Sequence, residues 1–199
     1  MNRAVELLIT GLAGLLALPF FLIAYVILRL SLGAPSVFRQ TRSGLHDVPF
    51  TVIKLRTMSD ARAPDGALLP DAQRQTPIST IVRRLRLDEL PQLLTILRGE
   101  MALVGPRPLL RETIAGFGQD GLRRATVRPG LTGWAQVSGN TMLSDTEKLQ
   151  LDLWYIANRS TWLDLRILAE TIGVALYGEQ RRVDRIALVS KSLTGSATS

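Results

Sequence analysis

Residues 7–28 read LLITGLAGLLALPFFLIAYVIL, a run of 22 positions without a charged residue. At ~1.5 Å per residue, a helix of this length could cross a ~30 Å hydrocarbon core. A secretory signal is disfavoured because the apolar part is too long and no small-residue cleavage site precedes the basic flank at Arg29. A buried helix of a soluble core is disfavoured because the segment is apolar on every side. This stretch therefore predicts a membrane-associated protein.

Pro19 lies close to the middle of the apolar segment. A proline inside a helix cannot donate to the carbonyl four residues earlier, here that of Leu15, and its ring crowds that carbonyl, so we expect a kink. Each half is then too short to span a bilayer, which permits a re-entrant helix that enters and leaves on the same side. The physical argument alone slightly favours the alternative, a kinked anchor that spans once.

The basic residues near the segment lie mainly after it: Arg29, Arg39, Arg42 and Lys54 follow, whereas Arg3 and the terminal amine precede. Such a bias places the bulk of the chain in the cytoplasm under either geometry. The whole chain of 199 residues carries a formal charge of +7, which attracts phosphate on nucleic acid, anionic lipid or nucleotides alike. Dispersed arginines and an aromatic content of 6% argue against a nucleic-acid partner.

Beyond the apolar segment the sequence predicts a mainly helical α+β domain. Residues 36–42 and 48–56 are short and partly alternating, which predicts a β-hairpin with the sole histidine, His46, solvated in its turn. Residues 59–77 are rich in Pro, Gly and polar residues, which is typical of a loop. Helical patterns begin at Ile78 and cover Glu89–Arg98, Leu149–Asn158 and Trp162–Tyr177, and the last two suit a membrane surface or a packed core.

The segment VRRLRLDELPQLLTILRGEMALVGPRP (82–108) carries the most chemistry. Asp88 and Glu89 are adjacent carboxylates at a predicted helix start, with Asp88 as the expected N-cap, and three arginines precede them. Such a site could bind a phosphate or its Mg²⁺ complex. GPRP mounts Arg107 between two prolines, and RPG (128–130) predicts a type II turn. Taken singly, each feature is more often structural than catalytic, since carboxylates commonly cap helices.

Together and in this order, the motifs resemble the bacterial sugar transferase family, the monotopic phosphoglycosyl transferases. The resemblance covers nearly the whole chain and rests on KLRTM, LDELPQL, RGEMALVGPRPLL, RPGLTGWAQVSG and LDLWYI, after an apolar segment broken by proline. It implies a re-entrant membrane helix. It also implies transfer of a sugar 1-phosphate from a UDP-sugar to polyprenyl phosphate, with release of UMP.

The resemblance also assigns roles to residues. Asp88 matches the nucleophile, which would carry the phosphosugar covalently, and Glu89 matches the second acidic residue, which is expected to help hold Mg²⁺. Arg83 and Arg107 match arginines that we assign to phosphate contacts, and Lys54 is a further candidate for substrate binding. Three residues depart from the family's usual pattern: Leu18 and Arg86 each stand where serine is usual, and Asn140 stands where arginine is usual. Asn140 could alter selectivity for the sugar or the nucleotide.

We therefore expect three parts: a membrane-associated helix broken at Pro19 (1–30), a cytoplasmic catalytic domain (31–191) and a flexible tail (192–199). The protein is expected at the bacterial inner membrane, bound to the lipid bilayer, with UDP-sugar and polyprenyl phosphate as substrates and no nucleic acid. The alternative from another class is a catalytically silent scaffold for glycan assembly, against which the intact Asp88, Glu89 and GPRP argue. The sequence leaves open the sugar, the glycan pathway and whether the chain forms a homodimer.

Overall fold

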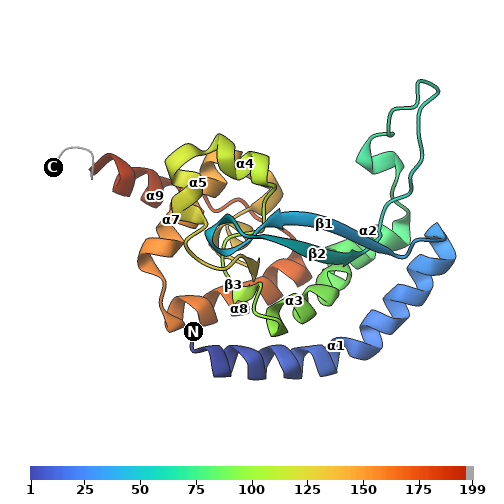
Figure 1. Ribbon diagram of the computed structural model, residues 1–199, viewed down its shortest axis with the longest axis horizontal. Helices are drawn as coiled ribbons and strands as arrows, with labels where there is room; N and C mark the ends of the chain where they lie inside the picture. Colours follow the sequence, from blue (N-terminus) through green and yellow to red (C-terminus); the bar gives the residue numbers. More distant parts are fainter. Residues whose placement is uncertain (196–199) are drawn as a thin grey trace.

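A computed structural model describes the backbone of residues 1–195 and the side chains of residues 1–190. It is mainly helical, as expected, with two small two-stranded sheets (Figure 1). The strands are β1 (Val37–Ser43), β2 (Pro49–Leu55), β3 (Ala102–Val104) and β4 (Gly130–Thr132). The helices are α1 (Arg3–Leu32), α2 (Pro77–Arg84), α3 (Leu93–Leu97), α4 (Arg111–Gly116), α5 (Gly118–Arg124), α6 (Trp134–Val137), α7 (Asp145–Asn158), α8 (Thr161–Tyr177) and α9 (Val183–Gly195). The 3-10 helices are η1 (Leu45–Asp47), η2 (Asp71–Gln73), η3 (Leu87–Gln92) and η4 (Asn140–Met142).

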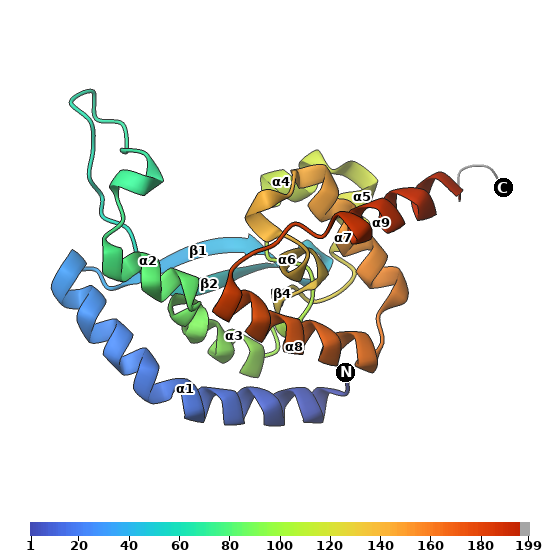
Figure 2. The same cartoon turned by 180° about the vertical axis from the view of Figure 1, so that it is seen from behind.

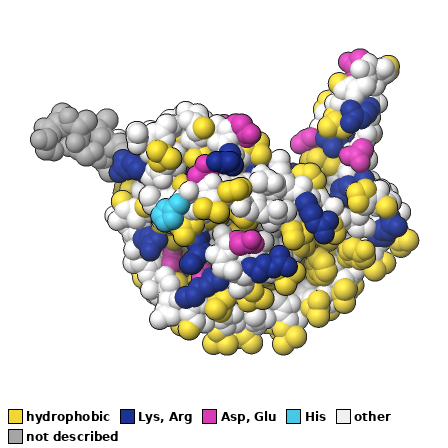
Figure 3. Space-filling view, viewed as in Figure 1, with side chains coloured by type: hydrophobic (Ala, Val, Ile, Leu, Met, Phe, Trp, Pro, Cys, Tyr) yellow, Lys and Arg dark blue, Asp and Glu magenta, His cyan; other side chains and the backbone are white. Residues whose placement is uncertain are grey.

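Helix α1 contains the apolar segment, and its axis changes direction near the middle (Figure 1). Pro19 lies inside the helix, so the proline bends α1 but does not end it. The helix is long and apolar enough to cross a membrane by length and composition alone. Its outer face carries large exposed apolar side chains, among them Leu12, Leu16 and Phe20. In the space-filling view, hydrophobic side chains gather along the edge of the molecule where α1 lies (Figure 3).

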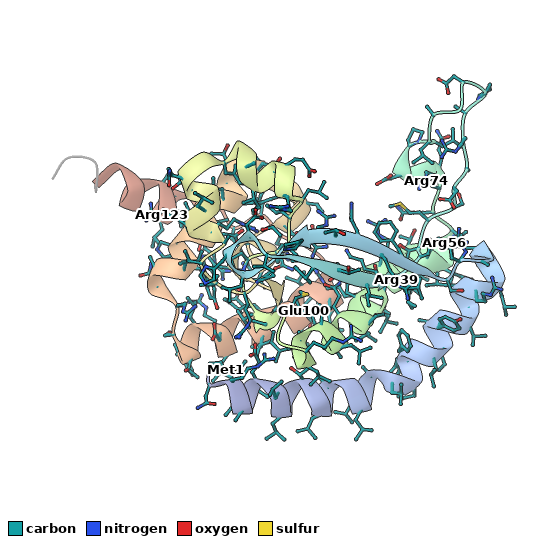
Figure 4. All side chains as sticks on the ribbon, in the orientation of Figure 1. Met1, Arg39, Arg56, Arg74, Glu100 and Arg123 are labelled. Carbon is teal, nitrogen blue, oxygen red and sulfur yellow. The ribbon has the colours of Figure 1, made fainter. Side chains whose placement is uncertain are left out.

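Both ends of α1 are fastened to the rest of the protein. At the N-terminal end, the buried Glu6 carboxylate accepts a 2.7 Å hydrogen bond from the backbone nitrogen of Leu103, and Arg3 donates to the carbonyl of Ile96 at 2.5 Å. At the C-terminal end, Arg56 donates to the carbonyls of Leu32 and Gly33, the latter at 3.0 Å. Figure 4 shows Met1 and Arg56 at these opposite ends. Apolar contacts reinforce the second end, where Ala24 and Leu28 pack on Leu55 and Val82.

The predicted β-hairpin is confirmed. Strands β1 and β2 pair antiparallel from Val37–Leu55 to Ser43–Pro49, and the exposed His46 lies in the connecting turn (Figure 3). The loop that follows projects from the body as an arm (Figure 1), with one short 3-10 turn, η2, in it. It leads into α2, where Thr76 and Ser79 form a reciprocal capping box.

The helix predicted for Glu89–Arg98 is wrong in its first part. Residues Leu87–Gln92 form the 3-10 helix η3, and only Leu93–Leu97 are α-helical. Asp88 is not an N-cap, because it lies inside η3, and Arg86 takes the capping position in a left-handed conformation (φ 56°). Pro91 has no N–H for a continuous helical hydrogen-bond ladder, which fits the tighter turn at this point.

Residues 128–130 do not form the predicted type II turn, because Gly130 has no positive φ and instead starts β4. Strand β4 pairs in parallel with β3, through Ala102–Gly130 and Val104–Thr132. Here the backbones of the two segments are in direct contact. A Cβ on Gly130 would lie 2.1 Å from the backbone nitrogen of Gly105, and a Cβ on Gly133 would lie 2.1 Å from the carbonyl oxygen of Gly105. The glycines of GPRP and RPGLTG are therefore required by close packing of two chain segments.

The main core lies where α3, α6, α7 and α8 meet the β3–β4 sheet, around the fully buried Ile96, Met101 and Ile167. Helices α7 and α8 confirm the helical patterns near the C-terminus. Helix α9, which the sequence analysis did not predict, continues to Gly195, so residues 192–195 of the expected tail are helical. The remainder of that tail, residues 196–199, lies outside the described residues.

Candidate functional site

A polar pocket of about 400 Å³ opens between η3, α2 and the C-terminal end of α8. Figure 2, which views the molecule from behind, shows the end of α8 beside α2 and α3. The pocket brings together all five residues that the sequence analysis singled out: Lys54, Arg83, Asp88, Glu89 and Arg107. They come from β2, α2, η3 and the loop after β3, so segments far apart in the sequence converge on one site.

Glu89 is held by three cations. Its Oε1 lies 2.8 Å from Arg107 and 3.3 Å from Lys54, and its Oε2 lies 3.4 Å from Arg86. Burial alone would raise the pKa of Glu89, but Arg107, Lys54 and Arg86 outweigh it and lower the pKa to about 2. Glu89 is thus ionised at any physiological pH and fixes the position of the cations around it.

Asp88 has the opposite environment. Within residues 1–190 its carboxylate forms no ion pair, although only 8% of the residue is exposed. Burial and then the adjacent Glu89 charge raise the pKa of Asp88 to about 6, against the attraction of Lys54 and Arg83. Adjacent carboxylates whose pKa values are pushed apart are a mark of sites with divided acid–base roles. Asp88 is therefore more basic than an ordinary carboxylate, and among the described residues no ion pair ties it to a cation.

The backbone of Arg107 is held in a fixed position by its neighbours. The close glycine packing fixes the GPRP backbone behind it, and the buried Arg124 donates to the Arg107 carbonyl at 2.6 Å. Arg124 is itself neutralised by the buried Asp152, at 2.8 Å. The Glu89 charge raises the pKa of Arg107 further, so the guanidinium is a permanent cation in the pocket wall. A fixed guanidinium suits recognition of phosphate oxygens.

Arg83 and Lys54 add two more positive groups to the same wall. Arg83 lies in the last turn of α2 and forms no ion pair in the described part of the chain, so its charge is available to an anionic ligand. Burial lowers the pKa of Lys54, and the neighbouring Glu89 opposes that effect. The pocket therefore combines one unpaired carboxylate with several cations, an arrangement that attracts a diphosphate and places a nucleophile beside it.

Sequence reasoning missed the far wall of the pocket. Glu179, which follows Gly178 at the end of α8, contacts Asn140, Thr141 and Arg86 there. Asn140 and Arg86 were noticed only as departures from a family pattern. Glu179 gave no sequence signal, because a carboxylate after a C-capping glycine is ordinary in any soluble helix.

The acidic pair offers only oxygen donors to a metal ion. Mg²⁺ prefers oxygen ligands and is usually bound by one or two carboxylates together with substrate phosphates and water. Asp88 and Glu89 supply two carboxylates in one pocket. The pocket's third carboxylate, Glu179, contacts Asn140, Thr141 and Arg86, and no three acidic, histidine or cysteine side chains of the described residues are grouped so that they could hold a metal ion. The residues fit a metal that arrives with a diphosphate, and they do not form a closed protein cage.

An apolar groove of about 440 Å³ lies between α1 and the η3–α3 segment. Its walls include Gly11, Gly14 and Leu18 from α1, and Leu90, Pro91 and Leu94 from the other side. Leu90 and Pro91 directly follow Glu89 in η3, so this 3-10 helix lines the polar pocket with Asp88 and Glu89 and the apolar groove with the next two residues.

The chain is similar to known bacterial proteins. The family model described as bacterial sugar transferase matches residues 1–178. An uncharacterized sugar transferase, EpsL, from Bacillus subtilis is 46% identical over 79% of this chain and 78% of its own length. A UDP-glucose:undecaprenyl-phosphate glucose-1-phosphate transferase from Caulobacter vibrioides is 37% identical over 86% of this chain and 68% of its own. A UDP-N-acetylgalactosamine-undecaprenyl-phosphate N-acetylgalactosaminephosphotransferase from Aeromonas hydrophila is 34% identical over 89% of this chain and 44% of its own.

Proposed function

Because the chain belongs to the bacterial sugar transferase family, an enzyme family of sugar-phosphate transfer, we propose that it moves a sugar 1-phosphate from a UDP-sugar to polyprenyl phosphate. One observation carries the assignment of the chemistry: the unpaired Asp88 carboxylate lies beside the clamped Glu89 in a cationic pocket. The activities for which the Caulobacter and Aeromonas relatives are named support the two substrate classes. The product would enter a polysaccharide pathway.

The reaction proceeds in two displacements at one phosphorus. A carboxylate oxygen of Asp88 bonds to the β-phosphorus of the UDP-sugar, and the bond from that phosphorus to the bridging oxygen breaks. UMP leaves with the bridging oxygen, and the phosphosugar stays on Asp88 as an acyl phosphate. A phosphate oxygen of polyprenyl phosphate then attacks the same phosphorus, and the Asp88 carboxylate leaves. The product is a polyprenyl diphosphate sugar, and no proton has to be gained or lost at Asp88.

The surrounding residues stabilise the charge that moves through these steps. Arg83, Lys54 and Arg107 bind the non-bridging phosphate oxygens and neutralise negative charge as UMP departs. Glu89 keeps Arg107 and Lys54 in place through its ion pairs with them. Mg²⁺, held by Glu89 with Asp88 nearby, would supply further neutralisation of the diphosphate when bound.

The lipid acceptor accounts for the apolar parts of the structure. Its phosphate fits the cationic pocket, and its hydrocarbon chain fits the groove between α1 and α3, which is lined by Leu90 and Pro91, the residues directly after Glu89. Because both ends of α1 are fastened to the same body, we propose that α1 is a re-entrant helix with its ends on the cytoplasmic side of the inner membrane. The bend at Pro19 would lie deepest in the lipid.

The proposed activity is tested by mixing the detergent-solubilised protein with undecaprenyl phosphate and a panel of UDP-sugars. We expect release of UMP from at least one donor, in amounts equal to the polyprenyl diphosphate sugar formed. A catalytically silent scaffold would release none from any donor. Release of UDP in place of UMP would indicate an ordinary glycosyl transfer and would contradict the proposal.

The proposed topology is tested with single cysteines, since the chain has none. Ala4→Cys reports on the N-terminal end of α1 and spares Asn2, whose side chain caps the helix. Ala67→Cys, in the exposed arm, reports on the body. In spheroplasts treated with a membrane-impermeant maleimide, we expect both variants to be protected and both to be labelled after lysis. Labelling of the Ala4→Cys variant from outside, with the Ala67→Cys variant protected, would show that α1 spans the membrane.

A further inference from the structure

The two walls of the polar pocket differ in chemistry. The wall formed by β2, α2 and the GPRP loop carries the cations Lys54, Arg83 and Arg107. The opposite wall, at the end of α8 and the start of η4, carries an amide, a hydroxyl and a carboxylate, from Asn140, Thr141 and Glu179. Phosphate is attracted to the first wall. Arg86 pairs with both Glu89 and Glu179, so the second wall offers phosphate no unpaired cation. The second wall therefore suits a neutral, hydroxyl-rich part of the substrate.

Glu179 organises this second wall. Its Oε1 accepts from the side-chain nitrogen of Asn140 at 2.5 Å, and its Oε2 accepts from the backbone nitrogen of Thr141 at 3.1 Å and from the Thr141 hydroxyl. A guanidinium nitrogen of Arg86 lies 3.7 Å from Oε1. A carboxylate has about four acceptor positions. Three hydrogen bonds and the ion pair with Arg86 thus hold the Glu179 carboxylate against protein groups, and it acts by orienting its neighbours.

Asn140 is the neighbour that can still accept a hydrogen bond from a ligand. Donation from its side-chain nitrogen to Glu179 fixes the amide plane, and the side-chain carbonyl oxygen has no hydrogen-bond partner within residues 1–190. The backbone of Asn140 is left-handed (φ 42°), as is that of Arg86 (φ 56°), and both residues line the pocket. Such conformations are tolerated best by asparagine and glycine, and they cluster at functional sites in proteins.

We propose that Asn140 selects the transferred sugar by accepting a hydrogen bond from one of its hydroxyls, and that Glu179 is the residue that positions Asn140. The inference rests on the proposed function and specifies its sugar subsite. Ribose of the uridine carries similar hydroxyls, but it leaves with UMP after the first displacement. The sugar stays on Asp88 through both displacements, so a residue that recognises it affects both.

The decisive variant is Asn140→Gly, which removes the amide and keeps a residue suited to the left-handed backbone. We measure kcat/KM by UMP release for pairs of UDP-sugars that are epimers at one hydroxyl. The preference of the wild type for its best donor over the matching epimer should fall about tenfold or more in Asn140→Gly. Inhibition by UMP and the KM for undecaprenyl phosphate should change by less than about twofold.

Glu179→Gln provides the second variant, because it retains the shape of the side chain and loses the charge that orients Asn140. It should reduce donor preference in the same direction as Asn140→Gly. Asp145→Asn, an exposed substitution at the start of α7, serves as the matched control and should leave the preference unchanged.

Three results would overturn the inference. An equal loss of kcat/KM for every donor would show that Asn140 has only a structural role. A change confined to UMP inhibition would show that Asn140 recognises the uridine. If the wild type itself releases UMP from no donor, the proposed function fails and the inference fails with it.

Discussion

Asp88→Asn should reduce UMP release by at least about 10⁴-fold, because an amide cannot form the acyl phosphate on which both displacements depend. The variant should also carry no covalent phosphosugar after incubation with UDP-sugar alone. Its fold should survive. The raised pKa shows that the ionised Asp88 carboxylate is less favourable in the folded protein than in the unfolded chain, so at neutral pH its charge opposes folding. A neutral, isosteric residue should therefore leave the melting temperature no lower.

The measurement is single-turnover UMP release together with thermal melting of both proteins. Asp120→Asn is the matched control, since the Asp120 side chain on α5 is half exposed and its one ion pair in the described structure is with the exposed Arg123. Near-normal UMP release by Asp88→Asn would remove Asp88 from the nucleophilic role. A folded variant without activity, beside a fully active control, is the result that we expect.

Removal of divalent cations should abolish activity, with a fall of roughly 100-fold or more, and added Mg²⁺ should restore it. The reason is the charge of the leaving group in the proposed reaction. UMP would depart as a phosphate anion, and we expect a cation bound to the diphosphate to stabilise it together with the arginines and Lys54. Oxygen donors alone are available in the acidic pair, which favours a hard cation. Activity is measured after dialysis against EDTA and then over a Mg²⁺ titration.

Glu89→Gln separates the metal role from general damage to the pocket. It should raise the Mg²⁺ concentration that gives half-maximal activity, whereas Glu112→Gln, an exposed change at the start of α4, should not. Unchanged activity in a thoroughly chelated sample would mean that the protein cations suffice and that no metal takes part.

Local patterns predicted much of this fold. The hairpin followed from β-branched residues around a turn, and α7 and α8 followed from helical periodicity, because in each case neighbouring residues determine the structure. The helix start at Asp88 was wrong because capping rules assume an α-helix, whereas Pro91 favours the tighter 3-10 turn of η3. Strand β4 was missed because three residues give no period, and Gly130 is explained only by the distant Gly105 against which it packs.

In the site, too, residues in local motifs were predictable and residues defined by distant contacts were not. Asp88, Glu89 and Arg107 were found because they lie in compact motifs, and the pocket does bring them together with Lys54 and Arg83. Glu179 could not be found, because its contacts with Asn140 and Arg86 join three segments that no local pattern relates. The different pKa values of the two carboxylates could not be predicted from the sequence either. They depend on the fact that Glu89, and not Asp88, forms ion pairs with Arg107, Lys54 and Arg86.

The most direct test of the central claim is the mass of the protein after incubation with an accepted UDP-sugar and Mg²⁺, without the lipid acceptor. We predict one phosphosugar per chain, located by peptide mapping at Asp88, with one equivalent of UMP released. Addition of undecaprenyl phosphate should then remove the modification and yield the polyprenyl diphosphate sugar. Rapid turnover with both substrates, combined with no UMP release and no modification when the acceptor is withheld, would show direct transfer and contradict the covalent role of Asp88.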